Sequence, residues 1–330
     1  MPQPEYKKKI NLSQVLPLSH PLSIHIELTN KCNFKCFYCP TSLDDFEEKS
    51  GGLYFLSPNQ FKKIIDQILD VGGCNVLKLW IMGEPLLNKN IFEYIQHAKQ
   101  ILNKTKIEIT TNGSVLNNEN GIKLINSGVD NVIISLHGID DLFNKTSNSK
   151  LKYEKIKKNI FDFNKNLENS RKKVFCSIRL IQQKNIDEFV KFKEQFGKLE
   201  LMNLIYDIPH NWKDDTNEFY DLVDGSNIEI LNKKKQNKDV CPFPFYTLAV
   251  HGNGEMSMCC VDWDKKTSIG NCLTNTTIKE AWNSSRADKF RYLHLNRETH
   301  KNEACNKCDY FKYYTSDNLD GVDKKLFETN

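Results

Sequence analysis

The sequence has little net charge and no long hydrophobic segment. Its 46 Lys and Arg residues are nearly balanced by 42 Asp and Glu residues, which gives a net charge of +4. This small excess gives no reason to expect a nucleic-acid or membrane partner, since both attract strongly basic surfaces. No uninterrupted apolar run approaches the roughly 18 residues of a membrane span.

The sequence also lacks an export signal. Three lysines stand at 7–9, but the residues that follow, such as Asn11, Gln14 and His20, are too polar for the core of a signal peptide. We therefore expect a soluble, cytoplasmic protein. Hydrophobic residues make up 39% of the chain, which is enough for a folded core. The length predicts two domains, or one α/β barrel with an addition.

Cysteine, in contrast, is abundant. The chain has 11 cysteines, an odd number that cannot pair completely within one chain, and a reducing cytosol disfavours disulfides. They gather at 32–39 and 241–308, with Cys74 and Cys176 alone between these groups. We interpret the isolated pair as small buried hydrophobic residues and the two groups as sites of metal binding or chemistry.

Strand and helix patterns alternate from residue 23 to 207. Helices are expected from Ser57 to Gly72 and near 90–102, 117–127, 151–168 and 185–196. Strands are expected at 24–28, 76–81, 106–110, 131–136, 174–180 and 200–206. Six β/α units with right-handed crossovers predict an α/β fold, a partial (β/α)6 barrel that stays open on one side.

The pattern changes after residue 207. The stretch 208–240 is polar and rich in Asn, Asp and Lys, and 241–330 carries a hairpin signal at Asn253-Gly254. We therefore expect an N-terminal extension at 1–22, a barrel core at 23–207, a linker or substrate-facing segment at 208–240, and a small α+β domain at 241–330.

The first cysteine group has the spacing C-x3-C-x2-C, at Cys32, Cys36 and Cys39. It follows the first strand, which in a parallel barrel places it at the active-site end. Three thiolates can hold three irons of a [4Fe-4S] cluster and leave the fourth open to another ligand. Structural zinc is the alternative and requires a fourth ligand, for which His25 is the nearest candidate.

This triplet, with Tyr38 before its last cysteine, resembles the radical S-adenosylmethionine (SAM) superfamily. The segment MGEP at 82–85 is similar to the family's Gly-Gly-Glu-Pro motif, with Met in place of the first Gly. The segment TNG at 111–113 follows the third strand, and Ser135 ends the fourth, both at positions where the family binds SAM.

The resemblance implies that SAM occupies the open iron and yields a 5′-deoxyadenosyl radical when an electron arrives. It also implies which residues contact SAM: Glu84 and the carbonyls around Gly83 at the ammonium group, Arg179 at the carboxylate, Asn112 and Ser135 at ribose or methionine polar groups, and Tyr38 near adenine. A surface ion pair is the alternative for Arg179, a structural role is the alternative for Asn112 and Ser135, and packing is the alternative for Tyr38. His97 and His137 are expected to be surface or packing residues.

The second cysteine group is similar to the SPASM or twitch extension of radical SAM enzymes, which holds auxiliary iron–sulfur clusters. The cysteine count favours one auxiliary [4Fe-4S] cluster, bound by Cys241, Cys259, Cys305 and Cys308. Adjacent strand residues face opposite sides, so only one of Cys259 and Cys260 is expected to face the cluster. The resemblance favours Cys259, because its distance along the chain from the turn at Gly254 fits the family. Cys272 is expected to be structural. For the four ligating cysteines, a zinc ribbon is the alternative to an iron–sulfur cluster.

Together these features predict a radical SAM oxidoreductase, dehydrogenase-like, in which the radical abstracts a substrate hydrogen and the auxiliary cluster accepts an electron. A carbohydrate-like or other small molecule is the favoured substrate, because 1–22 is too short for the leader-peptide domain of many peptide-modifying relatives. A flavodoxin or ferredoxin would supply electrons. Alternatives are an epimerase in which Cys260 returns the hydrogen, a peptide- or protein-modifying enzyme, and a non-catalytic iron–sulfur or zinc protein. No other catalytic residue is assigned.

Overall fold

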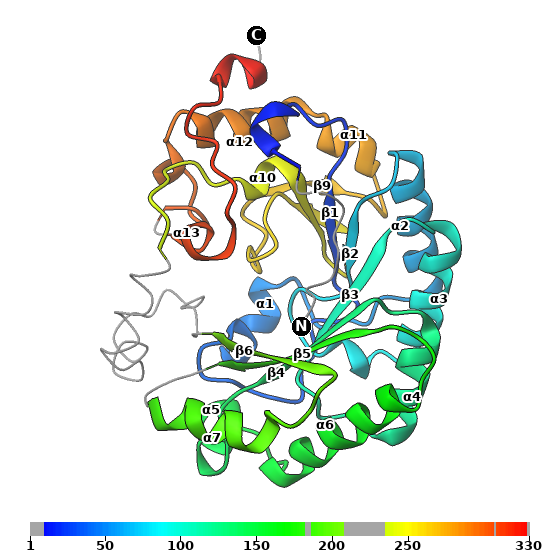
Figure 1. The fold of residues 1–330 in the computed structure, drawn as a ribbon. Helices are drawn as coiled ribbons and strands as arrows, with labels where there is room; N and C mark the ends of the chain where they lie inside the picture. The colour runs from blue at the N-terminus through cyan, green and yellow to red at the C-terminus, as the bar shows by residue number, and fades with distance from the viewer. Residues whose placement is uncertain (1–9, 182–185, 208–234, 307, 329–330) are drawn as a thin grey trace.

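One curved sheet organises the chain. The computed structural model describes residues 10–181, 186–207, 235–306 and 308–328. Within them the strands follow the order β6-β5-β4-β3-β2-β1-β7-β8-β9, and helices cover the outer side of the arc (Figure 1). The α/β fold with a partial barrel, expected from the sequence, is confirmed. The expected linker lies almost wholly at 208–234, outside the described residues.

The six expected barrel strands are present and parallel. They are β1 Ser23–Ile26, β2 Val76–Lys78, β3 Lys106–Thr111, β4 Asn131–Leu136, β5 Phe175–Ile181 and β6 Met202–Asp207. Strand β2 is shorter than the expected 76–81, because its end turns into the loop that carries the MGEP segment. Leu79 still donates its N–H to the Glu108 carbonyl at 2.9 Å, so the backbone stays beside β3 for one more residue.

The five expected helices are also present. They are α2 Pro58–Asp70, α3 Ile91–Ile101, α4 Asn118–Ser127, α6 Tyr153–Glu168 and α7 Ile186–Phe196. Helix α2 begins with a capping box between Ser57 and Gln60, which satisfies two N–H groups that the helix leaves without partners. Helices that the sequence patterns did not predict are α1 Phe46–Lys49, α5 Asp141–Ser147, α10 Phe243–Tyr246, α11 Ile278–Trp282, α12 Ser285–Leu295 and α13 Phe311–Tyr314.

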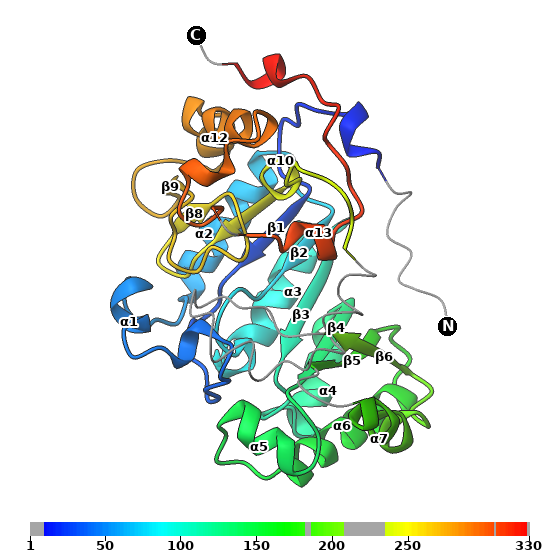
Figure 2. The same ribbon diagram turned by 90° about the vertical axis from the view of Figure 1, so that its left-hand side faces the viewer.

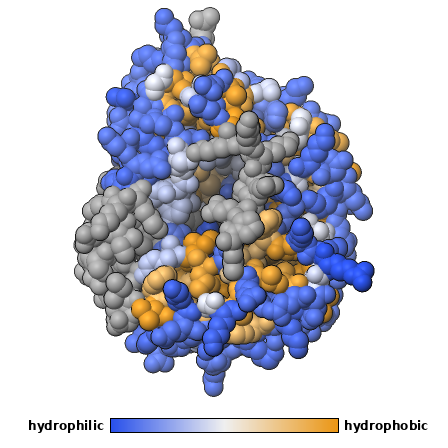
Figure 3. All heavy atoms as spheres, viewed as in Figure 1, coloured by the Kyte–Doolittle hydropathy of each residue, from blue (hydrophilic) through white to orange (hydrophobic). Residues whose placement is uncertain are grey.

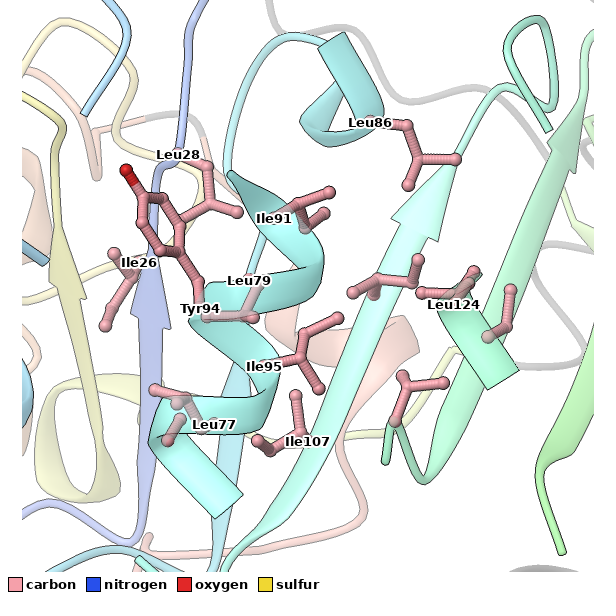
Figure 4. Packing of buried hydrophobic residues seen from close by; sticks show 14 of the residues in the cluster. Ile26, Leu28, Leu77, Leu79, Leu86, Ile91, Tyr94, Ile95, Ile107 and Leu124 are labelled. Atoms are coloured by element: carbon pink, nitrogen blue, oxygen red, sulfur yellow. The ribbon is translucent and has the colours of Figure 1, made fainter. Parts of the chain in front are cut away.

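The core lies between the sheet and the outer helices. Strand residues Ile26, Leu77 and Ile107 meet Ile91 and Ile95 of α3, and all are fully buried (Figure 4). Burying each such side chain contributes about 1.5–3 kcal/mol. Because strand side chains alternate, the residues between these apolar positions face the inside of the barrel, and most of them are polar.

The sheet continues into the C-terminal part of the chain. Strand β7 Thr247–Val250 pairs in parallel with β1, and β8 Glu255–Ser257 and β9 Ser268–Asn271 follow antiparallel (Figure 2). Trp282 of α11 is fully buried in the barrel core and donates Nε1–H to the Leu18 carbonyl at 2.9 Å. Sheet and core therefore cross the boundary expected at 241, and the division into two domains stays a prediction. No helix among the described residues is long and apolar enough to span a membrane.

A buried carboxylate lies at the β1–β7 contact. Glu27 is 1% exposed, accepts hydrogen bonds from Met82 N at 3.1 Å and from Tyr54 Oη, and lies 3.5 Å from His251 Nδ1. Burial acts to raise the pKa of Glu27, but His251, Tyr54 and the Met82 amide outweigh it and hold that pKa below its ordinary value. Glu27 is therefore ionised at neutral pH and depends on these partners.

We expect His251→Leu to destabilise the fold by about 2 kcal/mol, because it leaves a buried carboxylate with one partner fewer. The free energy of unfolding from urea titration of the metal-free protein measures the effect. His300→Leu, at an exposed histidine, is the control and should change stability by less than about 0.5 kcal/mol. Equal stability of the two variants would show that the Glu27–His251 contact does not stabilise the fold.

Candidate functional site

Donors point at the sulfurs of the N-terminal cysteine triplet, in the loop after β1. Phe34 N donates to Cys32 Sγ at 3.4 Å, and Thr41 Oγ1 donates to Cys39 Sγ at 3.3 Å. Asn112 Nδ2, from the end of β3, lies 3.8 Å from Cys32 Sγ. Hydrogen bonds to sulfur are typical of sites that hold negatively charged thiolates, including iron–sulfur clusters.

The three thiols lie close enough to affect one another. Burial, the charge of Glu84 and the nearby Cys39 raise the pKa of Cys32 to about 12. Burial and the same neighbouring sulfurs raise the pKa of Cys36 well above its ordinary value. Such thiols stay protonated until a bound metal supplies positive charge.

The donor set fits an iron–sulfur cluster. No three His, Cys, Asp or Glu side chains in the described ranges are arranged around a single metal ion. Thiolates of a cubane ligate separate irons and need not meet at one point. His25, the fourth ligand that zinc would require, lies on the inner face of β1 with Nδ1 3.4 Å from the Trp80 carbonyl.

Gly83 packs directly on the backbone that leads into the triplet. Its φ is +72°, and a Cβ there would lie 2.5 Å from the Thr29 carbonyl oxygen and 2.7 Å from that of Lys31. Glu84 N donates to the same Lys31 carbonyl at 2.9 Å. Only glycine allows this approach, so the MGEP segment fixes the path of the cysteine loop.

Glu84 ties the ends of β2 and β3 together. Its Oε1 accepts from Leu86 N at 3.0 Å and from Thr111 Oγ1 at 2.7 Å, and its Oε2 accepts from Asn112 N at 2.6 Å. Burial raises the pKa of Glu84 to about 7. Both carboxylate oxygens already hold donors from the chain, so its expected contact with the SAM ammonium group stays a prediction.

Asn112 holds the cysteine loop as well. Its Nδ2 donates to Asn33 Oδ1 at 3.0 Å, and its Oδ1 accepts from Ser114 N at 2.9 Å. Ser135 lies half-buried on β4, opposite Arg179 of β5 in the sheet register. The expected contacts of Asn112 and Ser135 with ribose or methionine stay predictions.

Tyr38 has a partner that the sequence analysis did not assign. Its Oη hydrogen-bonds to Nδ1 of His137, which stands just after β4. Burial raises the pKa of Tyr38 and lowers that of His137 to about 4, so at neutral pH the tyrosine donates to a neutral imidazole. The position of His137, two residues after Ser135 at a barrel strand end, was the available signal.

Arg179 faces the C-terminal segment. Its Nε lies 3.7 Å from Asp207 Oδ2 at the end of β6, and Tyr314 Oη donates to Asp207 Oδ1 at 2.7 Å. Tyr314 stacks on Tyr310, with ring centroids 4.3 Å apart. The guanidinium therefore lies where the barrel meets α13, and its pairing with the SAM carboxylate stays a prediction.

The C-terminal cysteines share one cavity. Cys241, Cys259, Cys305 and Cys308 all line it, together with largely apolar side chains such as Phe290 and Phe311. Four thiols on an apolar wall fit a second iron–sulfur cluster, whose ligands would be these cysteines. Assignment of the four as ligands stays a prediction.

The other two cysteines of this group do not line the cavity. Cys260 lies within hydrogen-bonding reach of the neighbouring Cys259 and of His25 of β1. Cys272 is buried, and its carbonyl accepts from Gln67 Nε2 of α2 at 2.8 Å. Cys74 and Cys176 are buried in the core, as expected.

The inner face of the barrel is polar. Lys78 of β2 lies 3.9 Å from Glu108 of β3, which accepts from Asn131 of β4 at 2.7 Å. One layer closer to the triplet, Trp80 Nε1 and Thr110 Oγ1 are buried atoms without a hydrogen-bond partner among the described residues. Figure 3, drawn from the same direction as Figure 1, shows a hollow near the middle of this side of the molecule. The barrel interior thus offers unused hydrogen-bonding groups to a ligand.

We expect Gly83→Ala to abolish assembly of the N-terminal cluster, since the added Cβ displaces the backbone before Cys32. After anaerobic reconstitution, iron should fall from about eight to about four per chain, counting four for each cubane. Gly321→Ala, where a Cβ meets nothing within 4 Å, is the control and should keep full iron content. Full iron in Gly83→Ala would refute the role of this close contact.

Comparison with known proteins agrees with this geometry. Residues 26–195 match the radical SAM superfamily, and residues 241–309 match the iron–sulfur cluster-binding SPASM domain. A probable GTP 3′,8-cyclase of Sulfolobus acidocaldarius is 37% identical over 122 residues, 37% of this chain and 36% of that protein. A GTP 3′,8-cyclase of Staphylococcus haemolyticus is 32% identical over 142 residues, 41% of this chain and 40% of that protein. The chain therefore spans well under half the length of these curated relatives.

Solved structures share the fold over nearly the whole chain. BtrN in complex with AdoMet and 2-DOIA has a TM-score of 0.55 and 18% identity, covering 92% of this chain and 97% of that one. SuiB of Streptococcus suis bound to S-adenosylmethionine has a TM-score of 0.63 and 14% identity, covering 90% and 74%.

Proposed function

The chain belongs to the radical SAM superfamily, and from that premise we propose that it oxidises a small, polar, carbohydrate-like molecule held inside the barrel. When bound, the cofactors of the family, SAM and its [4Fe-4S] cluster, supply a 5′-deoxyadenosyl radical that can take hydrogen from carbon. The chain itself must hold these groups, orient the substrate and exclude water.

The observation that carries the proposal is that the barrel interior holds charged groups of both signs close together. Lys78 Nζ lies 3.9 Å from Glu108 Oε1, and Arg179 Nε lies 3.7 Å from Asp207 Oδ2. A strongly anionic substrate needs cations that are free to pair with it, and these pairs would have to separate first. A ligand rich in hydroxyl groups instead meets donors and acceptors of both kinds.

Trp80 and Thr110 are the residues that we propose to bind this substrate. A buried donor without an acceptor costs about 1–3 kcal/mol, so a ligand that places oxygen atoms at Trp80 Nε1 and Thr110 Oγ1 recovers that energy. Their strands end at the MGEP and TNG segments, which we propose to hold SAM. Substrate and SAM would therefore be neighbours.

The C-terminal cavity adjoins the same interior. Tyr310 lines the cavity, and its pKa is raised by burial and by the nearby Cys260, Cys259 and Asp207, while Arg179 acts in the opposite direction. One tyrosine thus lies between the cavity and the barrel residues at the ends of β5 and β6. This adjacency supports an electron-accepting role for the cluster that we propose Cys241, Cys259, Cys305 and Cys308 to hold.

A GTP cyclase is the second candidate, favoured by the sequence similarity to the curated relatives. That similarity covers 37% and 41% of this chain, and the carboxylates beside Lys78 and Arg179 do not favour a triphosphate. Epimerisation is a further alternative, in which the thiol of Cys260, close to His25 of β1, returns a hydrogen to the substrate radical.

We expect deuterium from a ring-deuterated polyol or aminocyclitol to appear in 5′-deoxyadenosine, together with a product that has lost two electrons. Mass spectrometry of both compounds measures the transfer under reducing, anaerobic conditions. A parallel reaction with GTP deuterated in its ribose tests the second candidate. Transfer from GTP alone would replace the proposal, and solvent deuterium in an unoxidised product would select epimerisation.

We expect Trp80→Phe and Thr110→Val each to raise KM for the accepted substrate about fivefold, because each removes one hydrogen bond worth about 1 kcal/mol. Slow cleavage of SAM without substrate should stay unchanged, since neither residue is proposed to touch the cysteine triplet. Thr274→Val, at an exposed threonine, is the matched control. Unchanged KM in both barrel variants would place the substrate elsewhere.

A further inference from the structure

We propose that His294 donates a hydrogen bond to the Cys305 sulfur and thereby raises the reduction potential of the C-terminal cluster. His294 is then a positioning residue that acts through a cluster ligand. The proposal goes beyond the choice of substrate and rests on Cys305 being a ligand of that cluster.

The geometry places the imidazole at the cavity wall. His294 stands in the last turn of α12, is 2% exposed, and lines the same cavity as the four cysteines. Its Nε2 lies 3.7 Å from Cys305 Sγ, a hydrogen-bonding distance for sulfur. The ring packs edge-on against Phe290 with centroids 4.8 Å apart, which fixes its orientation.

The protonation of the ring follows from the ligand. A cysteine that binds iron is a thiolate and can only accept hydrogen bonds. Nε2 of a neutral imidazole must therefore carry the hydrogen and point it at Cys305 Sγ. Nδ1 is then a bare acceptor, which agrees with its lack of a hydrogen-bond partner among the described residues. The opposite tautomer would bury an unpaired N–H and set two lone pairs against each other.

The hydrogen bond is expected to affect the reduction potential because it stabilises negative charge on the cluster. Reduction adds one negative charge, part of which resides on the ligating sulfurs. A donor at sulfur stabilises the reduced form more than the oxidised form, and hydrogen bonds to sulfur are among the factors that set cluster potentials. Removing this N–H should therefore make the cluster harder to reduce.

The test uses the full chain with Cys32, Cys36 and Cys39 replaced by Ala, so that only the C-terminal cluster gives a signal. His294→Phe in this background keeps an aromatic ring but loses the donor. At a fixed solution potential, EPR should show a ratio of reduced to oxidised cluster about fivefold lower, the equivalent of about 1 kcal/mol for one hydrogen bond. His294→Gln, which restores an N–H donor, should recover part of the shift, and the exposed His300→Phe should have no effect.

Iron content separates the possible outcomes. About four irons per chain with a lowered ratio supports the proposal. An unchanged ratio at full iron overturns it. Loss of iron in His294→Phe equal to that in Cys305→Ala also overturns it, because His294 would then be a ligand. No iron in the parent chain would instead refute the C-terminal cluster itself.

A second measurement does not depend on the variants folding. Pulsed EPR of the parent chain labelled with ¹⁵N-histidine should detect a weak coupling from one imidazole nitrogen to the reduced cluster. A strong coupling typical of a directly bound nitrogen, or no coupling, would each overturn the proposal.

Discussion

The close contact between two backbones at the mouth of the barrel is the constraint on which the N-terminal site depends. The MGEP loop lies so close to the carbonyls of Thr29 and Lys31 that only a glycine fits at position 83. Glu84 then fastens the same loop to the end of β3, through Thr111 and Asn112. The cysteine loop is therefore held by two contacts: the backbone at Gly83, which packs on it, and the Asn112 side-chain amide, which donates a hydrogen bond to Asn33. This backbone packing holds Cys32 and Cys36, whose pKa values are raised by burial, near each other.

A second constraint joins the two cysteine sites. Strand β7 is hydrogen-bonded along β1, so the C-terminal segment extends the barrel sheet. This places His251, just after β7, against the buried Glu27, just after β1. Cys260, which follows β8, lies close to His25 of β1. The C-terminal cavity consequently stands beside the barrel interior, with Tyr310 between them.

Much of this arrangement was predictable from the sequence, and the exceptions have physical causes. Alternating apolar residues identified six strands, and helical periodicity identified five helices, because each packs one face on the core. Helix α5 was missed because its seven residues are too short to show a period. The contact of β7 with β1 was missed because strand pairing between distant segments leaves no local pattern. Spacing indicated the N-terminal triplet, and the resemblance to SPASM domains indicated the C-terminal set, Cys241, Cys259, Cys305 and Cys308, which lines one cavity.

The histidines that hydrogen-bond to site residues were harder to predict from the sequence than the cysteines and motifs that make up the sites. His137 and His294 carry no motif, since a histidine near a strand end or in the last turn of a helix is common in any fold. Their partners, Tyr38 and Cys305, are apparent only in three dimensions. Burial lowers the pKa of His137 to about 4, so this imidazole is neutral at physiological pH. A neutral ring beside the Tyr38 phenol directs a hydrogen bond without adding a charge to the barrel.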